Sequence, residues 1–547
     1  MTKYIKEQKL LVLAAFAFGF FSIFFILITP LFLGKFYQLV MDSDSARGKI
    51  FNAIFGKIDA INEFIFLFIL ILVLKLILGY FQSLSIGFLN ESFSKYLREV
   101  LFKNQLNTKL QEFEKKEVGN YLIRYSGDMR SITKFFTKGI IGFTNDLLFI
   151  ILTLSIFYWI NNQLTLIILL FFPILFICIY FLNLKMKKIS SKQRDKRSQI
   201  LSFVTSRLSA LFTIKALNRT NIEFTKFQNI SDEQFQLGKK YFLWFSLVEN
   251  SLPFLLYTML CALFYCAYQI NHSTSKIIDG AEILVFIMMT VNIIPVLRRV
   301  LKVNIIWQNG NISFRKLLVI LNMKSENSSH DTTFSKSTKQ SILFEDVSFS
   351  YNSEKEVLKN FNLSIQNYGV YHLKGSEGSG KGTIHKLLLG LYDPNQGKIV
   401  LNGINVNEID TIQLRKSIAF ASDDLTLIGK TIFEAVSYSR KEANKKLVLQ
   451  LLVQLGFFEG DILVDEALIQ RKIQGMSSSE RKTLILARAF FTDKKIILLD
   501  EPFNGLQDRV KENLINLIHD QSRRKIILIT SKENDTFISY NEKFSID

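Results

Sequence analysis

The feature that most constrains this chain is a series of six long apolar segments within its first 306 residues. They occupy approximately residues 9–33, 63–88, 139–160, 163–183, 242–269 and 280–305. Each has about 20 residues or more, the number that a helix needs to cross a hydrocarbon core about 30 Å thick. Hydrophobic residues make up 49% of the 547 positions, and the mean hydropathy is +0.22. A membrane domain of six spanning helices is therefore predicted, and a purely soluble enzyme is excluded.

The segments between these spans differ in charge. Residues 89–138 carry ten Lys or Arg and residues 184–241 carry thirteen, whereas residues 270–279 carry only Lys276. Because cytoplasmic loops are enriched in positive charge, we expect both basic segments and the N-terminus to lie in the cytoplasm. Apolar positions at helical spacing in both segments indicate that the membrane helices continue into the cytosol. These segments account for much of the net charge of +19, so no nucleic-acid partner is expected.

A change of composition separates the membrane part from the rest of the chain. Residues 321–340 lose the apolar periodicity and are rich in Ser, Thr, Asn and Lys, which is typical of a linker. After them, short β-rich runs alternate with helical stretches, as in an α/β domain with a largely parallel sheet. The expected strands cover residues 341–349, 370–373, 398–401, 495–499 and 525–529. The predicted organisation is a transmembrane domain at 1–320, a linker at 321–340 and an α/β domain at 341–547.

The expected strand at 370–373 is followed by a glycine-rich loop and a helical stretch. Glycines in such a loop let backbone N–H groups turn towards a phosphate, and the helix N-terminus adds positive potential. Lys381 is spaced to reach the β- and γ-phosphate oxygens. The pattern is that of a P-loop (Walker A motif) and predicts an ATP site. The residues expected to form it are Gly375, Ser376, Gly378, Ser379, Gly380, Lys381, Gly382 and Thr383.

The position after the lysine departs from the P-loop pattern. It normally carries Ser or Thr, whose hydroxyl binds Mg²⁺, and here it is Gly382. Thr383 follows one residue later and is the hydroxyl that we expect to serve the metal instead.

A second candidate element is the run KIILLDE at residues 495–501. It ends an apolar strand with two carboxylates, an arrangement that desolvation makes unfavourable without a function. Asp500 is placed to hold Mg²⁺ through water, and Glu501 to orient or deprotonate the attacking water.

With these motifs, the chain resembles ATP-binding cassette (ABC) exporters of the half-transporter type, in which six membrane helices precede one nucleotide-binding domain. Two segments, 115–136 and 213–219, are similar to the family's intracellular coupling segments. Tyr351 corresponds to the aromatic residue that stacks on adenine. Further similarity lies in residues 344–351, 387–406 and 484–490.

The resemblance implies a dimer in which two nucleotide domains enclose two ATP molecules. Each ATP would be held by the P-loop of one chain and the signature motif of the other, where Ser477 is the expected contact. The Q-loop glutamine corresponds to Asp423, which we expect to bind nucleotide and Mg²⁺, and the switch histidine corresponds to Ser531, an expected catalytic residue. The nucleotide domain is expected in the cytoplasm and the spans in the cytoplasmic (inner) membrane, in contact with membrane lipids.

Several positions differ from the family pattern where Mg²⁺ and the γ-phosphate are handled. The signature reads Met476-Ser477-Ser478-Ser479-Glu480 in place of Leu-Ser-Gly-Gly-Gln. The added side chains lie where backbone should approach the phosphate, and Glu480 places a carboxylate near an anion. Removing one electrostatic contact to a transition state costs about 10²–10³ in rate. Together with Gly382, Asp423 and Ser531, these changes predict that ATP binds and that hydrolysis is weak.

Two functions follow from these expectations. The first is ATP-dependent export of a peptide, lipid-like or drug-like substrate by a dimeric ABC transporter, either a homodimer or a heterodimer with a second half-transporter. The second is an ATP-binding but weakly or non-hydrolysing subunit that completes or regulates a heterodimeric exporter. Charges inside the spans bear on the cargo. Lys75 and Glu249 either line the transport cavity or lie on helix extensions in cytosolic water, and cytosolic water is the expected place of Arg298 and Arg299.

Overall fold

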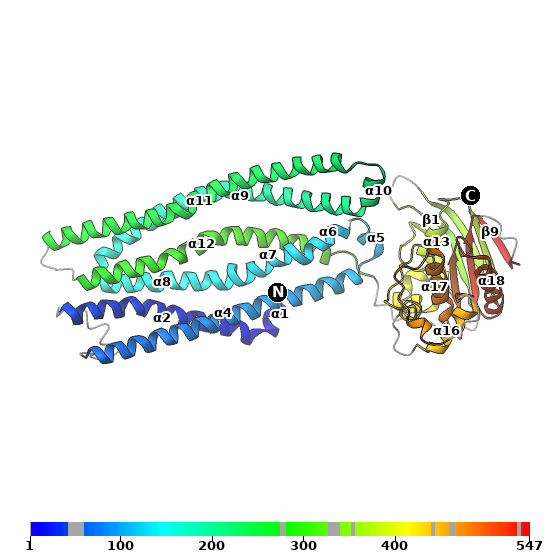
Figure 1. Ribbon diagram of the computed structural model, residues 1–547, viewed down its shortest axis with the longest axis horizontal. Coiled ribbons are helices and arrows are strands. Elements are labelled where there is room, and N and C mark those ends of the chain that lie inside the picture. Colours follow the sequence, from blue (N-terminus) through cyan, green and yellow to red (C-terminus); the bar gives the residue numbers. More distant parts are fainter. Residues whose placement is uncertain are drawn as a thin grey trace. The chain divides into compact units, whose positions relative to one another are not determined.

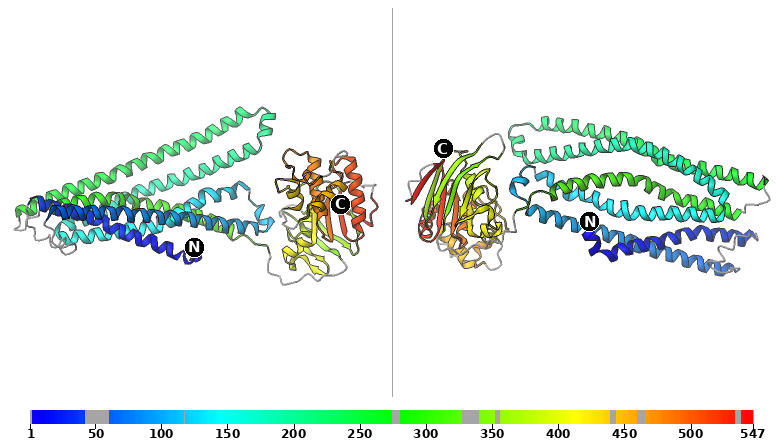
Figure 2. Two further views of the ribbon diagram at one scale, coloured as in Figure 1. Left: turned by 60° about the horizontal axis from the view of Figure 1, so that its bottom comes forward. Right: turned by 180° about the vertical axis from the view of Figure 1, so that it is seen from behind.

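The structure is a computed structural model of the chain and describes residues 2–41, 60–116, 118–273, 280–326, 340–351, 356–438, 443–458, 465–532 and 538–546. It forms two compact units (Figures 1 and 2). The first contains Met1–Leu106 and Lys116–Asn322, and the second contains Asn107–Lys115 and Met323–Asp547. Most of the expected linker, residues 327–339, lies outside the described residues.

The first unit consists of helices (Figure 1). They are α1 (Thr2–Glu7), α2 (Lys9–Met41), α4 (Ile61–Leu106), α6 (Val118–Ile123), α7 (Met129–Lys134), α8 (Phe143–Ile160), α9 (Asn162–Ser209), α10 (Leu211–Ala216), α11 (Thr220–Ser273) and α12 (Gly280–Leu321), with π-helical segments at Arg124–Asp128 and Phe135–Gly142.

Length and composition allow five helical segments of the described chain to cross a membrane. They are Lys9–Tyr37, Ile61–Leu106, Val118–Ile160, Thr220–Ile270 and Gly280–Leu321. Five of the six expected spans lie in these segments. The sixth, 163–183, lies in α9, which begins with the shorter apolar run Asn162–Ile174.

Three helices continue well beyond a membrane-spanning length. With 46, 48 and 54 residues, α4, α9 and α11 are roughly 69–81 Å long at 1.5 Å per residue. This confirms that the basic segments prolong the membrane helices. The tight connection between α8 and α9 is stabilised by Asn161, whose side-chain oxygen accepts hydrogen bonds from the backbone N–H groups of Gln163 and Leu164 at 3.1 and 3.2 Å.

A buried apolar cluster joins α2, α8, α9, α11 and α12. At its centre the rings of Phe157 in α8 and Phe286 in α12 stack with centroids 4.5 Å apart. Elsewhere, α9 and α11 run side by side as a pair, as do α2 and α4 (Figures 1 and 2).

The second unit contains two sheets. The antiparallel sheet has the order β2-β1-β4-β5, and the parallel sheet has the order β6-β7-β8-β3-β9. The strands are β1 (Ile342–Phe349), β2 (Leu358–Ile365), β3 (Gly369–Gly375), β4 (Gln396–Leu401), β5 (Ile404–Asn405), β6 (Ile418–Ala421), β7 (Ile496–Asp500), β8 (Ile526–Ser531) and β9 (Glu542–Ile546). All five expected strands form, but two of them, 341–349 and 398–401, belong to the antiparallel sheet, not to the expected parallel one.

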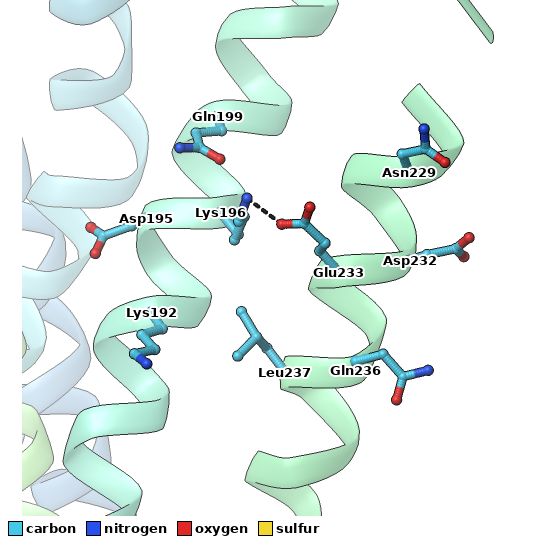
Figure 3. Close-up of a pocket in the computed structure, with 9 residues that line it drawn as sticks. All are labelled: Lys192, Asp195, Lys196, Gln199, Asn229, Asp232, Glu233, Gln236 and Leu237. Carbon is cyan, nitrogen blue, oxygen red and sulfur yellow. Dashed lines mark ion pairs between the residues drawn. The ribbon is translucent and has the colours of Figure 1, made fainter. Parts of the chain in front are cut away.

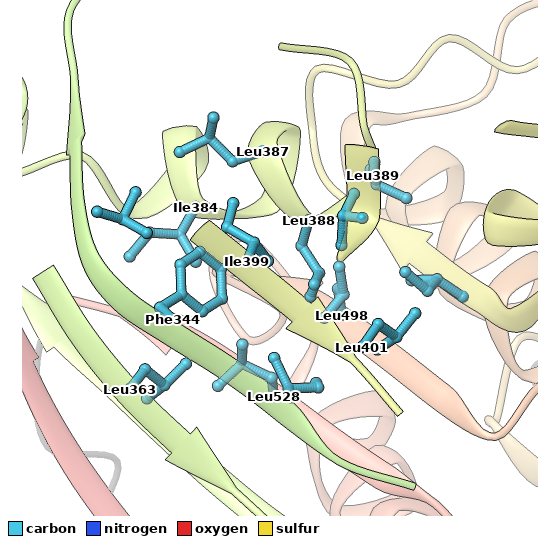
Figure 4. Close-up of a cluster of buried hydrophobic side chains, with 14 of the residues drawn as sticks. Phe344, Leu363, Ile384, Leu387, Leu388, Leu389, Ile399, Leu401, Leu498 and Leu528 are labelled. Carbon is cyan, nitrogen blue, oxygen red and sulfur yellow. The ribbon is translucent and has the colours of Figure 1, made fainter. Parts of the chain in front are cut away.

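The parallel sheet is covered on both faces, which explains its uninterrupted apolar strands. One apolar cluster lies between this sheet, the antiparallel sheet and α13 (Lys381–Leu388) (Figure 4). The other cluster involves α15 (Ile432–Ser437), α16 (Lys445–Gln454), α17 (Ser478–Phe491) and α18 (Asp508–Ser522). The buried side chains of Ile384, Leu387 and Leu388 anchor α13 and thereby fix the loop that precedes it.

Residues 107–115 were expected in the first domain, but they belong to the second unit. There, the Lys109 ammonium lies 2.6 Å from Asp393, and Tyr392 donates a hydrogen bond to Glu114. The backbone N–H of Glu326 also donates a hydrogen bond to the carbonyl oxygen of Asn107 at 2.7 Å. Such tertiary contacts carry no local sequence signal, which is why the boundary at residue 320 missed them.

Candidate nucleotide site

The glycine-rich loop connects β3 to α13, as its sequence predicts. Gly378 and Gly380 have φ angles of +81° and +98°, a region that favours glycine. A Cβ atom on Gly380 would also lie 2.9 Å from the Leu358 side chain. Glycine is therefore required at this turn for both conformational and steric reasons.

Lys381 folds its side chain over this loop. Its ammonium donates hydrogen bonds to the carbonyl oxygens of Gly375 at 2.6 Å and Ser376 at 2.7 Å. Within the described residues, the buried hydroxyl of Ser379 has no hydrogen-bonding partner. A fixed cation and an unsatisfied hydroxyl in the same loop fit a phosphate group.

A cavity of about 550 Å³ opens at the loop. It brings together residues from the P-loop, from the ends of β6 and β7, and from Tyr351 near the antiparallel sheet. Its lining consists of Tyr351, Val357, Glu377, Gly378, Gly380, Lys381, Gly382, Thr383, Lys386, Ser422, Asp423, Asp424, Asp500, Glu501 and Lys532. Most of the expected nucleotide and metal residues thus surround one cavity.

A larger groove of about 850 Å³ lies in the helical unit between α9 and α11 (Figure 3). Ionisable and amide side chains line it almost entirely, and Lys196 of α9 forms an ion pair with Glu233 of α11. Such a lining is typical of solvated helix surfaces, and we assign no chemistry to it.

Tyr351 presents a ring that is suited to stacking. Its side chain is 40% exposed, and its ring packs edge-on against Phe349 and Tyr392 with centroids 4.9 and 5.2 Å away. The ammonium of Lys386 lies 5.5 Å from the Tyr351 ring centroid. These neighbours hold the ring at the cavity wall, where the resemblance places adenine.

Asp500 is oriented by two hydroxyl groups. Thr530 donates to its Oδ1 at 2.7 Å and Ser422 donates to its Oδ2 at 3.2 Å. On the far side of Thr530, the Nε2 atom of His385 lies 3.0 Å from the Thr530 hydroxyl. Burial lowers the pKa of His385 to about 4, although the charge of Asp500 opposes this effect. His385 is therefore neutral near pH 7 and supports Asp500 through Thr530.

Gly382 provides no metal-binding hydroxyl at the position next to Asp500. A Cβ atom on Gly382 would lie 4.0 Å from Asp500 Oδ2, so this position faces the carboxylate. The hydroxyl of Thr383, our expected replacement, instead lies 3.1 Å from the Tyr351 hydroxyl. The prediction that Thr383 serves the metal therefore lacks geometric support.

Among the described residues, no group of three or more His, Cys, Asp or Glu side chains could hold a metal ion. Mg²⁺ commonly binds through one or two carboxylates together with nucleotide phosphates and water. Asp500 beside the P-loop fits that mode, in which ATP itself would provide the remaining ligands.

Glu501 follows β7 in an uncommon backbone conformation. Its φ is +46°, which residues other than glycine rarely adopt, and its carboxylate accepts a hydrogen bond from Asn504 at 2.6 Å. The Lys482 ammonium donates to the Glu501 carbonyl at 2.7 Å and lies 2.9 Å from Asp423 Oδ2. Asp423, which we expected to bind Mg²⁺, is thus paired with a lysine although it lines the cavity.

Ser477 does not line this cavity. It caps α17, where its hydroxyl lies 2.8 Å from the Glu480 carboxylate and accepts from the Glu480 backbone N–H at 3.2 Å. The same carboxylate accepts from the Ser477 backbone N–H at 2.7 Å. Glu480 therefore engages both the hydroxyl and the backbone N–H of Ser477 within α17.

Ser531, the residue at the switch position, is also placed away from the cavity lining. It is buried at the end of β8, and its hydroxyl lies 2.8 Å from His372 Nε2. The next residue, Lys532, lines the cavity and pairs with Glu377 at 3.1 Å, which raises the pKa of Lys532. Sequence reasoning missed Lys532, Lys386 and Ser422. Only their proximity to the recognised motifs could have indicated them.

Comparison with known families and structures agrees with this architecture. The family model for the ABC transporter transmembrane region matches residues 12–294, and that for the ABC transporter domain matches residues 358–504. The first of these matches alone covers more than half of the chain.

Among curated proteins, the chain is similar to the ATP-dependent lipid A-core flippase of Pasteurella multocida (strain Pm70), with 23% identity over 87% of this chain and 83% of that protein. It is also similar to a lactococcin-G-processing and transport ATP-binding protein of Lactococcus lactis subsp. lactis, with 22% identity over 84% of this chain and 66% of that protein.

Among solved structures, a bacterial Atm1-family ABC exporter with ATP bound shares the fold. Its TM-score is 0.82 at 14% sequence identity, over 100% of this chain and 94% of that one. This protein therefore belongs to the ABC transporters and is a multi-pass membrane protein with a cytoplasmic nucleotide-binding domain.

Proposed function

We propose that this chain is one half of a dimeric exporter that binds ATP with Mg²⁺ and hydrolyses it slowly. The observation that carries the proposal is the single cavity lined by Tyr351, Lys381, Asp500 and Glu501. These residues supply a base platform, a phosphate cation, a metal carboxylate and a water-orienting carboxylate. Bound Mg²⁺ would neutralise phosphate charge between the P-loop and Asp500.

The dimer is supported by the position of the signature segment. Ser477 belongs to the same unit as the cavity but is not among its lining residues. This position fits a dimer in which the signature segment of one chain completes the nucleotide site at the P-loop of the other chain. The second half-transporter is either an identical chain, which gives a homodimer, or a different one, which gives a heterodimer.

The cargo is proposed to be amphipathic. The relatives include a lipid A-core flippase and a lactococcin-G-processing and transport protein, whose names refer to a lipid and a peptide. In the helical unit, a pocket of about 250 Å³ combines aromatic and ionisable side chains. Glu249 lines it and lies 3.4 Å from Arg298 and 3.0 Å from Lys302.

This pocket bears on the residues singled out within the spans. Its lining includes Glu249 and Arg298 but not Lys75. Arg299 pairs with Asp146 at 2.6 Å, and its side chain is 57% exposed. A role of Glu249 in the transport cavity stays a prediction. Paired charges beside Tyr241 and Phe245 support a cargo with both polar and apolar parts.

Slow hydrolysis is supported by three local features. Gly382 offers no hydroxyl to a metal beside Asp500, Glu480 engages Ser477, and Ser531 provides no imidazole at the switch position. Each lost contact is worth about 10²–10³ in rate. The alternative, a non-hydrolysing subunit of a heterodimer, is favoured by the same features and opposed by the presence of Glu501.

The test is to measure nucleotide binding and ATPase turnover on the purified chain in lipid nanodiscs, with Glu501→Gln as the reference for no hydrolysis. We expect saturable ATP binding and a low turnover that Glu501→Gln removes. Turnover equal to that of Glu501→Gln would select the non-hydrolysing alternative. Fast turnover would show that the departures from the family pattern do not matter.

A further inference from the structure

Lys482 is an internal cation next to the nucleotide cavity that none of the family motifs accounts for. It lies in the second turn of α17, and its side chain is only 8% exposed. Its ammonium touches two segments that are distant in sequence: Asp423 after β6 at 2.9 Å and the carbonyl of Glu501 after β7 at 2.7 Å.

A lysine buried to this degree requires compensation for its lost hydration. Here the compensation comes from a carboxylate that is itself 62% exposed and lines the cavity. The ammonium therefore lies behind the cavity wall, and Asp423 lies between it and the space that a nucleotide would fill. The pair fixes the position of the Asp423 side chain relative to Glu501.

The acidic character of the cavity lining indicates what the Lys482–Asp423 pair contributes. Its lining contains five acidic residues and three lysines, so the lining alone repels a polyphosphate. The acidic residues are Glu377, Asp423, Asp424, Asp500 and Glu501, and the lysines are Lys381, Lys386 and Lys532. Among the residues that the structure describes, two of the acidic side chains are paired with lysine, Glu377 with Lys532 and Asp423 with Lys482.

We propose that Lys482 is a positioning residue that neutralises Asp423 and holds it against the Glu501 backbone, so that the cavity accepts a nucleotide triphosphate. Asp423 is then the partner of an internal ammonium and not a ligand of Mg²⁺. This inference rests on the proposed function, because it presupposes that the cavity binds ATP. Lys482 should therefore increase the affinity of the cavity more for ligands with a larger negative charge.

The experiment compares the affinities of the full-length protein for fluorescent ATP and AMP analogues, without Mg²⁺ and at fixed ionic strength. Lys482→Gln leaves Asp423 unneutralised, so we expect ATP affinity to fall roughly three- to tenfold and AMP affinity to change by less than about twofold. Asp423→Asn removes the carboxylate and should shift the ATP-to-AMP affinity ratio in the opposite direction. The double variant Asp423→Asn/Lys482→Gln should restore the ratio of the wild type.

Lys511→Gln is the matched control. It removes the same formal charge from the same unit, but its ion pair with Asp508 is exposed in α18 and outside the cavity. We expect it to leave the ratio unchanged. Asp423→Asn keeps a side-chain oxygen that can accept from the Lys482 ammonium, and the Glu501 carbonyl still accepts from it. If Lys482→Gln does not fold, the opposite shift of Asp423→Asn decides the question.

Equal losses for ATP and AMP in Lys482→Gln, or a double variant no better than Lys482→Gln, would assign Lys482 a purely structural role and overturn the inference. An Asp423→Asn variant with an unchanged ratio would do the same. A wild-type protein that binds neither nucleotide would overturn the proposed function and this inference together.

Discussion

Replacing Gly382 with Ser should return a metal-binding hydroxyl to the position that lacks it. Apart from the chain neighbours and backbone of its own helix, the described atom nearest to a Cβ built on Gly382 is Asp500 Oδ2, at 4.0 Å. This is ordinary van der Waals contact, so there is room for the added Cβ beside Asp500. Position 382 lies in the first turn of α13, where Ser is also a better helix former than Gly.

The magnitude follows from the contact that is gained. A Ser hydroxyl beside Asp500 would replace one water ligand of Mg²⁺ and fix the metal against the phosphates. A complete electrostatic contact to a transition state is worth about 2.7–4 kcal/mol, or 10²–10³ in rate. Because water already fills part of that role, we expect a smaller effect than this full range, a rise in kcat of roughly 10- to 100-fold.

The assay is ATPase turnover of the purified protein in nanodiscs at fixed ATP while Mg²⁺ is titrated. Gly382→Ala is the matched control, because it adds the same Cβ and a similar gain in helix propensity without a hydroxyl. We expect Gly382→Ser to raise kcat and to reach half-maximal activity at lower Mg²⁺ than either Gly382→Ala or the wild type. If Ser and Ala behave alike, the missing hydroxyl is not what limits hydrolysis, and the reasoning about Gly382 is refuted.

Two further predictions concern other parts of the site. Glu480→Gln should release the Ser477 hydroxyl from a carboxylate and raise ATPase turnover by about tenfold, measured beside Ser478→Ala as a control; an unchanged rate would show that the Glu480 contact is harmless. His385 is neutral in the fold because its pKa is lowered to about 4, so its contribution to stability is complete above pH 6.5 and is lost as the pH falls towards 4. Thermal unfolding of His385→Gln should therefore vary less with pH between 6.5 and 4 than that of the wild type, and parallel curves would contradict this assignment.

The parts of the site that sequence predicted well are those encoded by local pattern. The P-loop needs glycines at fixed spacing before a lysine and a helix, and β7 needs an apolar run that ends in Asp500 and Glu501; both are complete within ten residues. The structure brings these two segments to one cavity because β3 and β7 are parallel strands of the same sheet, with β8 between them.

The parts that sequence could not predict depend on contacts between distant residues. Lys482 and Asp423 are separated by 59 positions, and neither belongs to a motif that requires the other. Ser531 aligns with a switch residue, but its hydroxyl is turned to His372, 159 positions away. The alternation that predicts strands cannot assign β1 and β4 to a separate antiparallel sheet, because strand pairing is a tertiary property.

The proposed function depends on ATP binding in the cavity at the P-loop through Lys381. The most direct measurement is equilibrium titration of the purified wild-type chain and Lys381→Ala with a fluorescent ATP analogue, after circular dichroism has verified that both are folded. We expect saturable binding to the wild type and a loss of at least about tenfold in affinity for Lys381→Ala, since a charge-assisted contact to phosphate contributes roughly 1.5–3 kcal/mol. Absence of saturable binding to the wild type, or equal affinities of the two proteins, would contradict it.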